Sequence, residues 1–269
     1  MKKTLIKIIN LSALLVFAVL SVFTCFSETA EYEYTMTSDP AASLLKMDGI
    51  NSSIEVIGND TNVIKIRVEG IEYLPEIPEG MRSLLSSGVD NTGLGLELKM
   101  SDSDKGLIEL KQVHRNNIGN KITIEVPKAL SIDIKTHMHQ GFQASNISGD
   151  VSAGSLNGSI ILNSVTGPLA LNTVNGKIEV DVISLNQDRP SSITTVNGKI
   201  DLILPVTEKA TFDLSTIHGD IYTNLDLAEK GDHENMDHIS GNIHTTLNGG
   251  GVSVTMSTVN GEICLRKAE

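Results

Sequence analysis

The sequence predicts an all-β fold, a single-domain β-solenoid or β-helix made of stacked coils with short strands. Three observations support this prediction. A glycine-centred motif occurs eight times, an aliphatic residue stands two positions before and two positions after each of these glycines, and the segments between them are rich in Ile, Val, Leu and Thr. Such repetition is typical of solenoids, in which each coil buries its apolar residues against its neighbours. The repeat glycines are Gly149, Gly158, Gly167, Gly176, Gly198, Gly219, Gly241 and Gly261.

The spacing of the glycines indicates the size of one coil. From Gly149 to Gly176 they are nine residues apart, and from Gly176 to Gly261 they are 20 to 22 residues apart. Two nine-residue units nearly equal one later unit, so we predict coils of roughly 20 residues with two strand-bearing sides. The early coils would carry the motif on both sides and the later coils on one. We expect both flanking aliphatic residues to point into the core.

A row of β-hairpins is the alternative, because Asn-Gly is the strongest short hairpin signal. In a hairpin that turns at Asn175-Gly176, however, Val174 would lie on the opposite sheet face from Ile178. A corner between two sheets fits the pattern better. The residues before the glycines would then form one column along the coils, in which stacked Asn side chains can hydrogen-bond. This column would contain Asn157, Asn175, Asn197, His218, Ser240 and Asn260.

The N-terminus has the layout of a secretory signal peptide. Three lysines among the first seven residues precede an apolar run at residues 11–23, which is short for a membrane-spanning helix of about 20 residues. We expect residues 1–27 to be the signal peptide, with cleavage after Ser27. Cys25 is a candidate lipidation residue, although the preceding Val-Phe-Thr is a poor lipoprotein cleavage box. We therefore expect an extracytoplasmic protein, periplasmic, in the cell envelope or secreted, with a lipoprotein anchor as an open alternative.

The region before the repeats is predicted to be β-rich. Residues 28–43 are a polar lead-in, and residues 44–140 form the N-terminal part of the solenoid, with an irregular insertion at 73–117 where Pro75 and Pro78 mark a turn. We expect this part to cap the glycine-repeat solenoid of residues 141–265, since a stack of strands must not leave a bare edge. Alternation of apolar and polar residues predicts strands at 49–56, 63–68, 93–100, 107–110, 121–127 and 131–135.

A resemblance to a known family adds to this interpretation. The segment 126–134, Val-Pro-Lys-Ala-Leu-Ser-Ile-Asp-Ile, followed by Ser-Gly-Asp-Val at 148–151 and the Thr-Val-Asn-Gly-Lys-Ile series, resembles the bacterial putative-adhesin family. This family is a domain of unknown function in exported and membrane-tethered proteins. The resemblance covers about residues 44–265. It implies a β-solenoid and an extracytoplasmic location, and it brings no catalytic residues.

Composition argues against several classes of function. The chain has 33 acidic and 21 basic residues, a net charge of −12, and no Trp. Nucleic-acid binding needs clustered Lys and Arg, so we expect none. The scarcity of aromatic residues disfavours a platform that stacks on sugar rings. Cys25 and Cys264 are the only cysteines, and signal cleavage would remove the first, so we expect no intramolecular disulfide.

Motifs with a chemical mechanism are weak or missing. His137 and His139 stand two apart, and Asp232-His233-Glu234 with Asp237-His238 form a second His-rich stretch, but no Cys or helical His pair accompanies them. The residue after the repeat glycines varies, which argues against a calcium-binding β-roll. We therefore expect no catalytic, cofactor-binding or metal-binding residue.

These observations favour an exported non-catalytic protein of the cell envelope or surface, an adhesin or interaction scaffold. Its partner would be an unknown protein or glycan at the envelope, and contact with the membrane would come only through a lipid on Cys25. Two alternatives stay open. One is a glycan-binding or glycan-processing β-helix, which would show a groove lined by carboxylates or aromatics from several coils. The other is an exported partner of an envelope sensing system.

Overall fold

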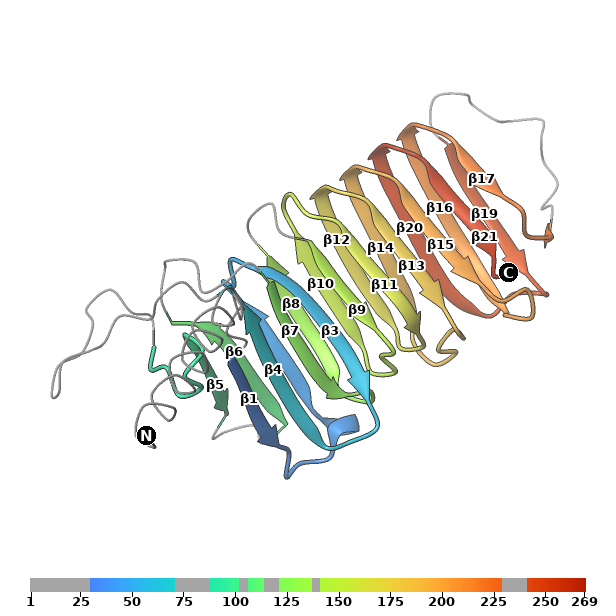
Figure 1. Ribbon diagram of the computed structural model, residues 1–269. Helices are drawn as coiled ribbons and strands as arrows, with labels where there is room; N and C mark the ends of the chain where they lie inside the picture. The colour runs from blue at the N-terminus through green and yellow to red at the C-terminus, as the bar shows by residue number, and fades with distance from the viewer. Residues whose placement is uncertain (1–29, 71–87, 102–105, 114–120, 137–140, 229–240) are drawn as a thin grey trace, which may run out of the picture.

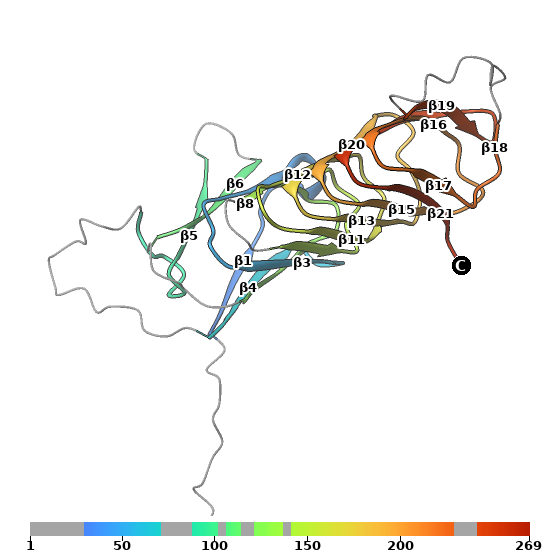
Figure 2. The same cartoon turned by 90° about the horizontal axis from the view of Figure 1, so that it is seen from above.

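The computed structural model describes residues 30–70, 88–101, 106–113, 121–136, 141–228 and 241–269. In these residues the chain forms two β-sheets and one short 3-10 helix, η1 (Pro40–Ala42). The sheets lie face to face in an elongated stack whose strands run across its long axis (Figure 1, Figure 2). The predicted all-β solenoid fold is confirmed. The predicted signal peptide, Cys25, His137, His139 and the stretch 232–238 lie outside the described residues.

The two sheets are named here sheet A and sheet B. Sheet A contains, in spatial order, β1 (Ala30–Thr35), β4 (Val63–Glu69), β7 (Lys121–Pro127), β3 (Ser53–Asn59), β9 (Phe142–Ser145), β11 (Ile160–Val165), β13 (Ile178–Val182), β15 (Ile200–Leu204), β21 (Ile263–Lys267) and β17 (Ile221–Thr223). Sheet B contains β18 (Leu227–Ala228), β19 (Gly241–Leu247), β16 (Ala210–His218), β20 (Val252–Asn260), β14 (Ser191–Asn197), β12 (Leu169–Asn175), β10 (Val151–Ser155), β8 (Ser131–Thr136), β2 (Leu44–Asp48), β6 (Leu107–Gln112) and β5 (Leu96–Met100).

The chain alternates between the sheets, and successive coils pair in parallel. Strand β12 lies in sheet B and β13 in sheet A, so Asn175-Gly176 is a corner and not a hairpin turn. Ile178 is in register with Ile160 on one side and Ile200 on the other. The first coils turn at a glycine on both sides, whereas residues 183–190 and 205–209 make longer connections on the side opposite the Asn-Gly corners. This explains the change of glycine spacing from nine to about twenty residues.

The core lies between the two sheets, and strand alternation builds it. The residues two positions after the corner glycines point inward, and Ile160, Ile178, Ile200 and Ile263 are each 0% exposed. Burying a side chain of this size contributes about 1.5–3 kcal/mol, before the loss of conformational entropy is counted. A repeated column of such residues along both sheets therefore holds the coils together without a disulfide; Cys264 is a free thiol.

The aliphatic residues before the Asn-Gly corners do not point inward, and this part of the prediction was wrong. Leu156, Val196 and Ile217 are 48%, 37% and 52% exposed. Only at the opposite corners, before Gly149 and Gly167, are the equivalent aliphatics Ile147 and Val165 buried.

The reason is the alternation within strands such as β14. Ile193 and Thr195 point inward, so Thr194 and Val196 point outward. The inward Thr195 is 1% exposed, and its hydroxyl donates a hydrogen bond to the carbonyl of Gly176 at 3.3 Å. Thr173, Thr216 and Thr258 make the same bond to a glycine carbonyl of the neighbouring coil. A buried hydroxyl that has a partner satisfies the corner better than an aliphatic group could.

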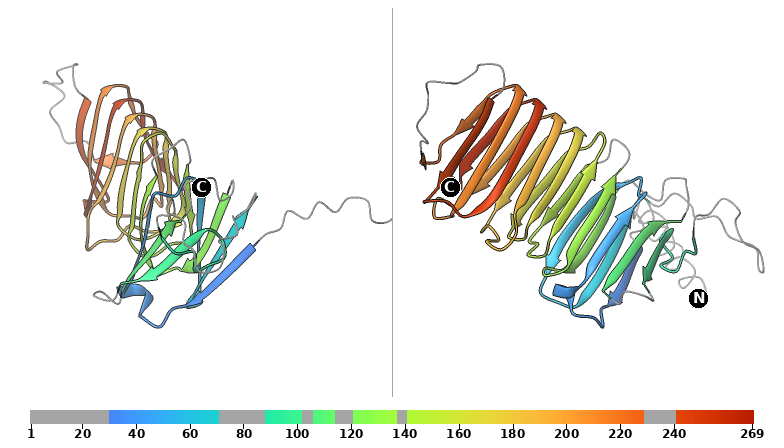
Figure 3. Two further views of the ribbon diagram at one scale, coloured as in Figure 1. Left: turned by 90° about the vertical axis from the view of Figure 1, so that its left-hand side faces the viewer. Right: turned by 180° about the vertical axis from the view of Figure 1, so that it is seen from behind.

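The coils do not follow the order of the chain at the C-terminal end of the stack. Strand β20 lies between β14 and β16, and β21 lies between β15 and β17. The coil formed by residues 252–267 is therefore inserted between two coils that precede it in the sequence (Figure 1, Figure 3). The spatial order also departs from the chain order near the N-terminus, where β2 lies between β6 and β8, and β3 between β7 and β9, but there the central coil precedes both of its neighbours in the sequence.

One predicted repeat is not a coil. Gly241 begins β19, which runs antiparallel to β16 and pairs with its outer edge. The turn from β19 to β20 crosses the start of β16, and Asn248, Gly249 and Gly250 all have φ between 51° and 88°. The Asn248 amide donates to the carbonyls of Val206 and Glu208 at 2.8 and 2.7 Å, which fixes the turn there. Gly241 thus belongs to a closing strand rather than to a corner.

Candidate functional site

The repeat glycines form columns at the corners, where the backbones of neighbouring coils touch. A Cβ added to Gly198 would lie 1.9 Å from the carbonyl oxygen of Gly176, and one added to Gly261 would lie 2.0 Å from that of Gly198. Gly219 meets Gly261 in the same way, and Gly176 meets Gly158. At the opposite corner, Gly167 meets the carbonyl of Gly149 at 1.9 Å and Gly149 meets that of Leu130 at 2.4 Å. These glycines are needed for close approach of the backbones, and they serve packing rather than binding.

A ladder of amides runs beside the first column. The side-chain nitrogen of Asn175 donates to the side-chain oxygen of Asn157, Asn197 donates to Asn175, and Asn260 donates to Asn197, at 2.8, 2.8 and 2.7 Å. His218 follows Asn260 in register. The predicted column therefore exists among the described residues, but Asn260 stands before His218. Because each inner amide binds both neighbours, the ladder is a structural feature of the corner.

The outer face of sheet B carries a surface that sequence reasoning missed. On β10, β12, β14 and β20 no outward side chain is charged, and we call this surface the neutral face. Strand registers align its residues in rows along the stack. Two rows are small and mostly polar, and a third row is aliphatic. The polar rows are Ser152, Ala170, Ser192 and Thr255, then Gly154, Asn172, Thr194 and Ser257; the aliphatic row is Leu156, Val174, Val196 and Val259.

Charged side chains point outward from most of the other described strands, although β9 and β11 of sheet A carry none. On sheet A, the neighbouring coils carry Lys177 paired with Glu179, and Asp201 held by both Lys199 and Arg266. Next to the neutral face on β8 stand Asp133 and Lys135, and on the far side β16 carries Asp213, which pairs with His244 of β19. The neutral face is thus an uncharged area on a protein of net charge −12. The alternating Ser and Thr of β14 and β20 are the sequence signal from which it could have been inferred.

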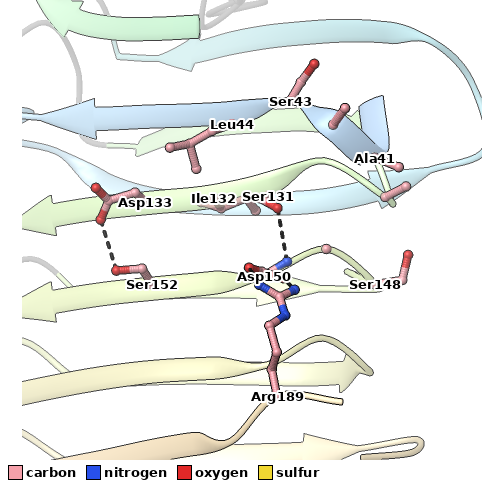
Figure 4. A pocket seen from close by; sticks show the side chains of 13 residues that line it. Ala41, Ser43, Leu44, Ser131, Ile132, Asp133, Ser148, Asp150, Ser152 and Arg189 are labelled. Carbon is pink, nitrogen blue, oxygen red and sulfur yellow. Dashed lines mark hydrogen bonds and ion pairs between the residues drawn. The ribbon is translucent and has the colours of Figure 1, made fainter. Parts of the chain in front are cut away.

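A groove adjoins the neutral face at Ser152. It has a volume of about 660 Å³ and lies between η1, the starts of β8 and β10, and Arg189 (Figure 4). Arg189 reaches back from the start of β14 and binds both carboxylate oxygens of Asp150. Asp133 accepts a hydrogen bond from the hydroxyl of Ser152 at 3.0 Å.

The chemistry of this groove is that of a structural ion pair. The carboxylate of Asp150 raises the pKa of Arg189 through their hydrogen bonds and charges, so the guanidinium stays charged. A carboxylate held by two bonds to a guanidinium is a poor general base, because its protonation would break the pair. Two carboxylates do line the groove, as a glycan-processing protein would require, but one is paired with Arg189 and the other accepts from Ser152.

Metal and membrane sites are not evident within the described ranges. No group of three or more His, Cys, Asp or Glu residues that could hold a metal ion occurs in that part of the chain. No helix among the described residues is long and apolar enough to cross a membrane. Cys264 lies in β21 in register with Asp201 and is 8% exposed.

Comparison with known proteins finds a family model that resembles the C-terminal part of the chain. No curated protein matches the chain. A structure from Clostridium sporogenes, described as a putative cell adhesion protein, aligns over 90% of this chain and 100% of its own, with 15% identity and a TM-score of 0.45. A second, described as a putative adhesin from Bacteroides fragilis, aligns over 90% and 97%, with 12% identity and a TM-score of 0.37. Residues 154–266, which include the Asn ladder and most of the neutral face, match the family model Toastrack DUF4097.

Proposed function

We propose that the protein is a non-catalytic interaction scaffold of the cell envelope or surface, and that the neutral face of sheet B is its binding surface. The observation that carries this proposal is the segregation of charge. An acidic chain keeps four adjacent strands of sheet B free of outward charges, whereas charged pairs stand on the coils of β13, β15 and β21 in sheet A. Uncharged exposed surface that can lose water at low cost favours contact with a partner, since desolvating unpaired charges is expensive.

The rigidity of the stack supports the same proposal. Buried isoleucine columns, close-packed corner glycines and the amide ladder fix the spacing of the coils, so the outward rows are preorganised. A preorganised surface loses little conformational entropy when it binds. The carboxylates of the groove, by contrast, are engaged with Arg189 and Ser152, which favours binding over catalysis.

Site-specific crosslinking in intact cells tests the surface. A photo-crosslinking residue at Thr194, in the middle of the neutral face, should capture envelope material, and the same residue at Asn163 should not. Asn163 is an exposed control on sheet A. Equal capture at both positions, or capture only at Asn163, would contradict the proposal.

The location is tested on the mature N-terminus. We propose that the chain is exported and processed, and mass spectrometry should find a start at Glu28 for a plain signal peptide. An acylated Cys25 would identify a lipoprotein instead. A cytoplasmic chain that retains Met1 or Lys2 would contradict export.

A further inference from the structure

The neutral face lacks the groups that recognise most macromolecules. It presents no Lys or Arg for phosphate groups, so nucleic acids and anionic lipids have no counterpart there. It also presents no Trp, Tyr or Arg, the residues that dominate binding energy at protein interfaces. It presents instead the hydroxyls of Ser and Thr, the side-chain amide of Asn172 and a row of aliphatic side chains.

The area of the face argues against a second copy of this chain as the partner. Four strands at about 4.8 Å spacing, with three rows of outward residues about 6.6 Å apart, cover an area of roughly 400 Å². A stable protein interface needs about 800 Å² from each partner. A polymer that runs along the rows has no such requirement, because it gains from repeated contacts of the same kind.

We infer that the neutral face binds a linear, uncharged polysaccharide that lies along the axis of the stack; this rests on the proposed binding role of the face. The hydroxyls of Ser192, Thr194, Thr255 and Ser257 both donate and accept, as sugar hydroxyls do. The aliphatic row, represented by Val196, lies beside them and would cover the C–H groups of the sugar rings in place of the stacked aromatic side chains that the face lacks. The neighbouring strands β14 and β20 carry hydroxyls in both polar rows, so sugar units that cross these two strands meet equivalent contacts.

The geometry distinguishes this ligand from a charged glycan. Asp133 beside Lys135 bounds the face at one margin and Asp213 beside His244 at the other, and the face itself carries no Lys or Arg, so an acidic polymer finds no cation within the contact. Binding of a neutral polymer depends on hydrogen bonds and apolar contact. It is therefore insensitive to salt, in contrast to binding through ion pairs.

Co-sedimentation with insoluble polysaccharides tests the inference. Cellulose, chitin and a β-1,3-glucan are the neutral probes. Polygalacturonate immobilised on beads is the acidic probe. The protein should bind at least one neutral probe equally at low and high salt. Thr194→Asp should weaken that binding about tenfold or more, because it places an unpaired carboxylate in the contact.

Matched variants separate the face from the fold. Asn163→Asp on sheet A adds the same charge and should bind like the unmodified protein. Val196→Thr, which keeps the shape but removes apolar surface, should weaken binding, whereas Val206→Thr at the exposed 205–209 connection should not. Urea unfolding confirms that all four variants are folded.

The outcomes are separable. Binding to no neutral probe, binding that prefers polygalacturonate, or neutral binding unchanged by Thr194→Asp overturns the inference. If the Thr194 crosslinker captures a protein in cells while no polysaccharide binds, the inference is wrong and the proposed binding role of the face stands. If neither assay detects binding through the face, both are wrong.

Discussion

Replacing Gly198 by Ala tests whether backbone contact at the corners holds the coils in place. The new Cβ would lie 1.9 Å from the carbonyl oxygen of Gly176 and 2.7 Å from its carbonyl carbon. Carbon and oxygen atoms normally approach to about 3.3–3.6 Å. The two coils must therefore separate locally by about 1.5 Å, and the obstructing atoms are backbone, which cannot rotate away.

The cost follows from the hydrogen bonds that cross this corner. Separation lengthens the 3.3 Å bond from the Thr195 hydroxyl to the Gly176 carbonyl and the 2.8 Å bond from Asn197 to Asn175. The buried Thr195 hydroxyl costs about 1–3 kcal/mol when it loses its partner, and the exposed amide bond costs less. Together with lost packing, we expect Gly198→Ala to lower the free energy of unfolding by about 3–5 kcal/mol.

Two other glycines serve as controls in the same urea titration followed by circular dichroism. A Cβ on Gly154 would meet only the exposed Asn172 side chain, at 3.2 Å, so Gly154→Ala should change stability by less than about 1 kcal/mol. Gly49 has φ of +70° and open space, so Gly49→Ala should show only backbone strain of about 1–2 kcal/mol. If Gly198→Ala unfolds within about 1 kcal/mol of Gly154→Ala, the contact argument is refuted.

The remaining predictions concern orientation, a buried ion pair and pH. Ile200→Asp should cost about 3 kcal/mol or more by burying an unpaired carboxylate, whereas Val196→Asp should cost less than about 0.5 kcal/mol, as thermal melts of both will show. Arg266→Gln removes a guanidinium from a carboxylate that is 5% exposed and should cost about 2 kcal/mol; the exposed control Arg189→Gln should cost at most about 1 kcal/mol, and equal losses would contradict the burial argument. The hydrogen bond from Lys111 lowers the pKa of Glu109 below 4.5, so its contribution is present at neutral pH and is lost as the pH falls below 4.5; Glu109→Gln should flatten that part of the stability profile measured by urea titration, and an unchanged profile would count against it.

Much of the architecture is encoded locally and could be predicted from the sequence. The aliphatic residue two positions after each corner glycine, such as Ile178, stands at the start of the next strand. Its position in the sequence therefore predicts that its side chain is buried in the core. The orientation of Val174 was predicted wrongly because its neighbour Thr173 has a similar preference for strands. The hydrogen bond from the Thr173 hydroxyl to the Gly158 carbonyl decides which of the two side chains points inward. That partner belongs to another coil and is invisible in a local pattern.

The order of the coils was beyond sequence reasoning for a different reason. The copies at Gly219 and Gly261 have the same length and register, so both fit next to the coil that contains Gly198. One signal was present: Asn260 continues the amide ladder from Asn197, whereas His218 carries no side-chain amide. The candidate surface was missed for the related reason that its residues become rows only when the strands are placed side by side.

The inserted coil of residues 252–267 makes the assembly of the stack depend on a part of the chain that is synthesised late. Until Val252 and the residues after it are available, the facing edges of β14 and β16 lack the strand that joins them. Coils that precede it can add one after another as the chain emerges, but this step must wait for a later segment to enter between finished neighbours. A polypeptide interrupted before Val252 would leave those edges open to other strands. Closure of the stack thereby depends on completion of the chain, and an intact segment 252–267 becomes a condition for paired strand edges at this end.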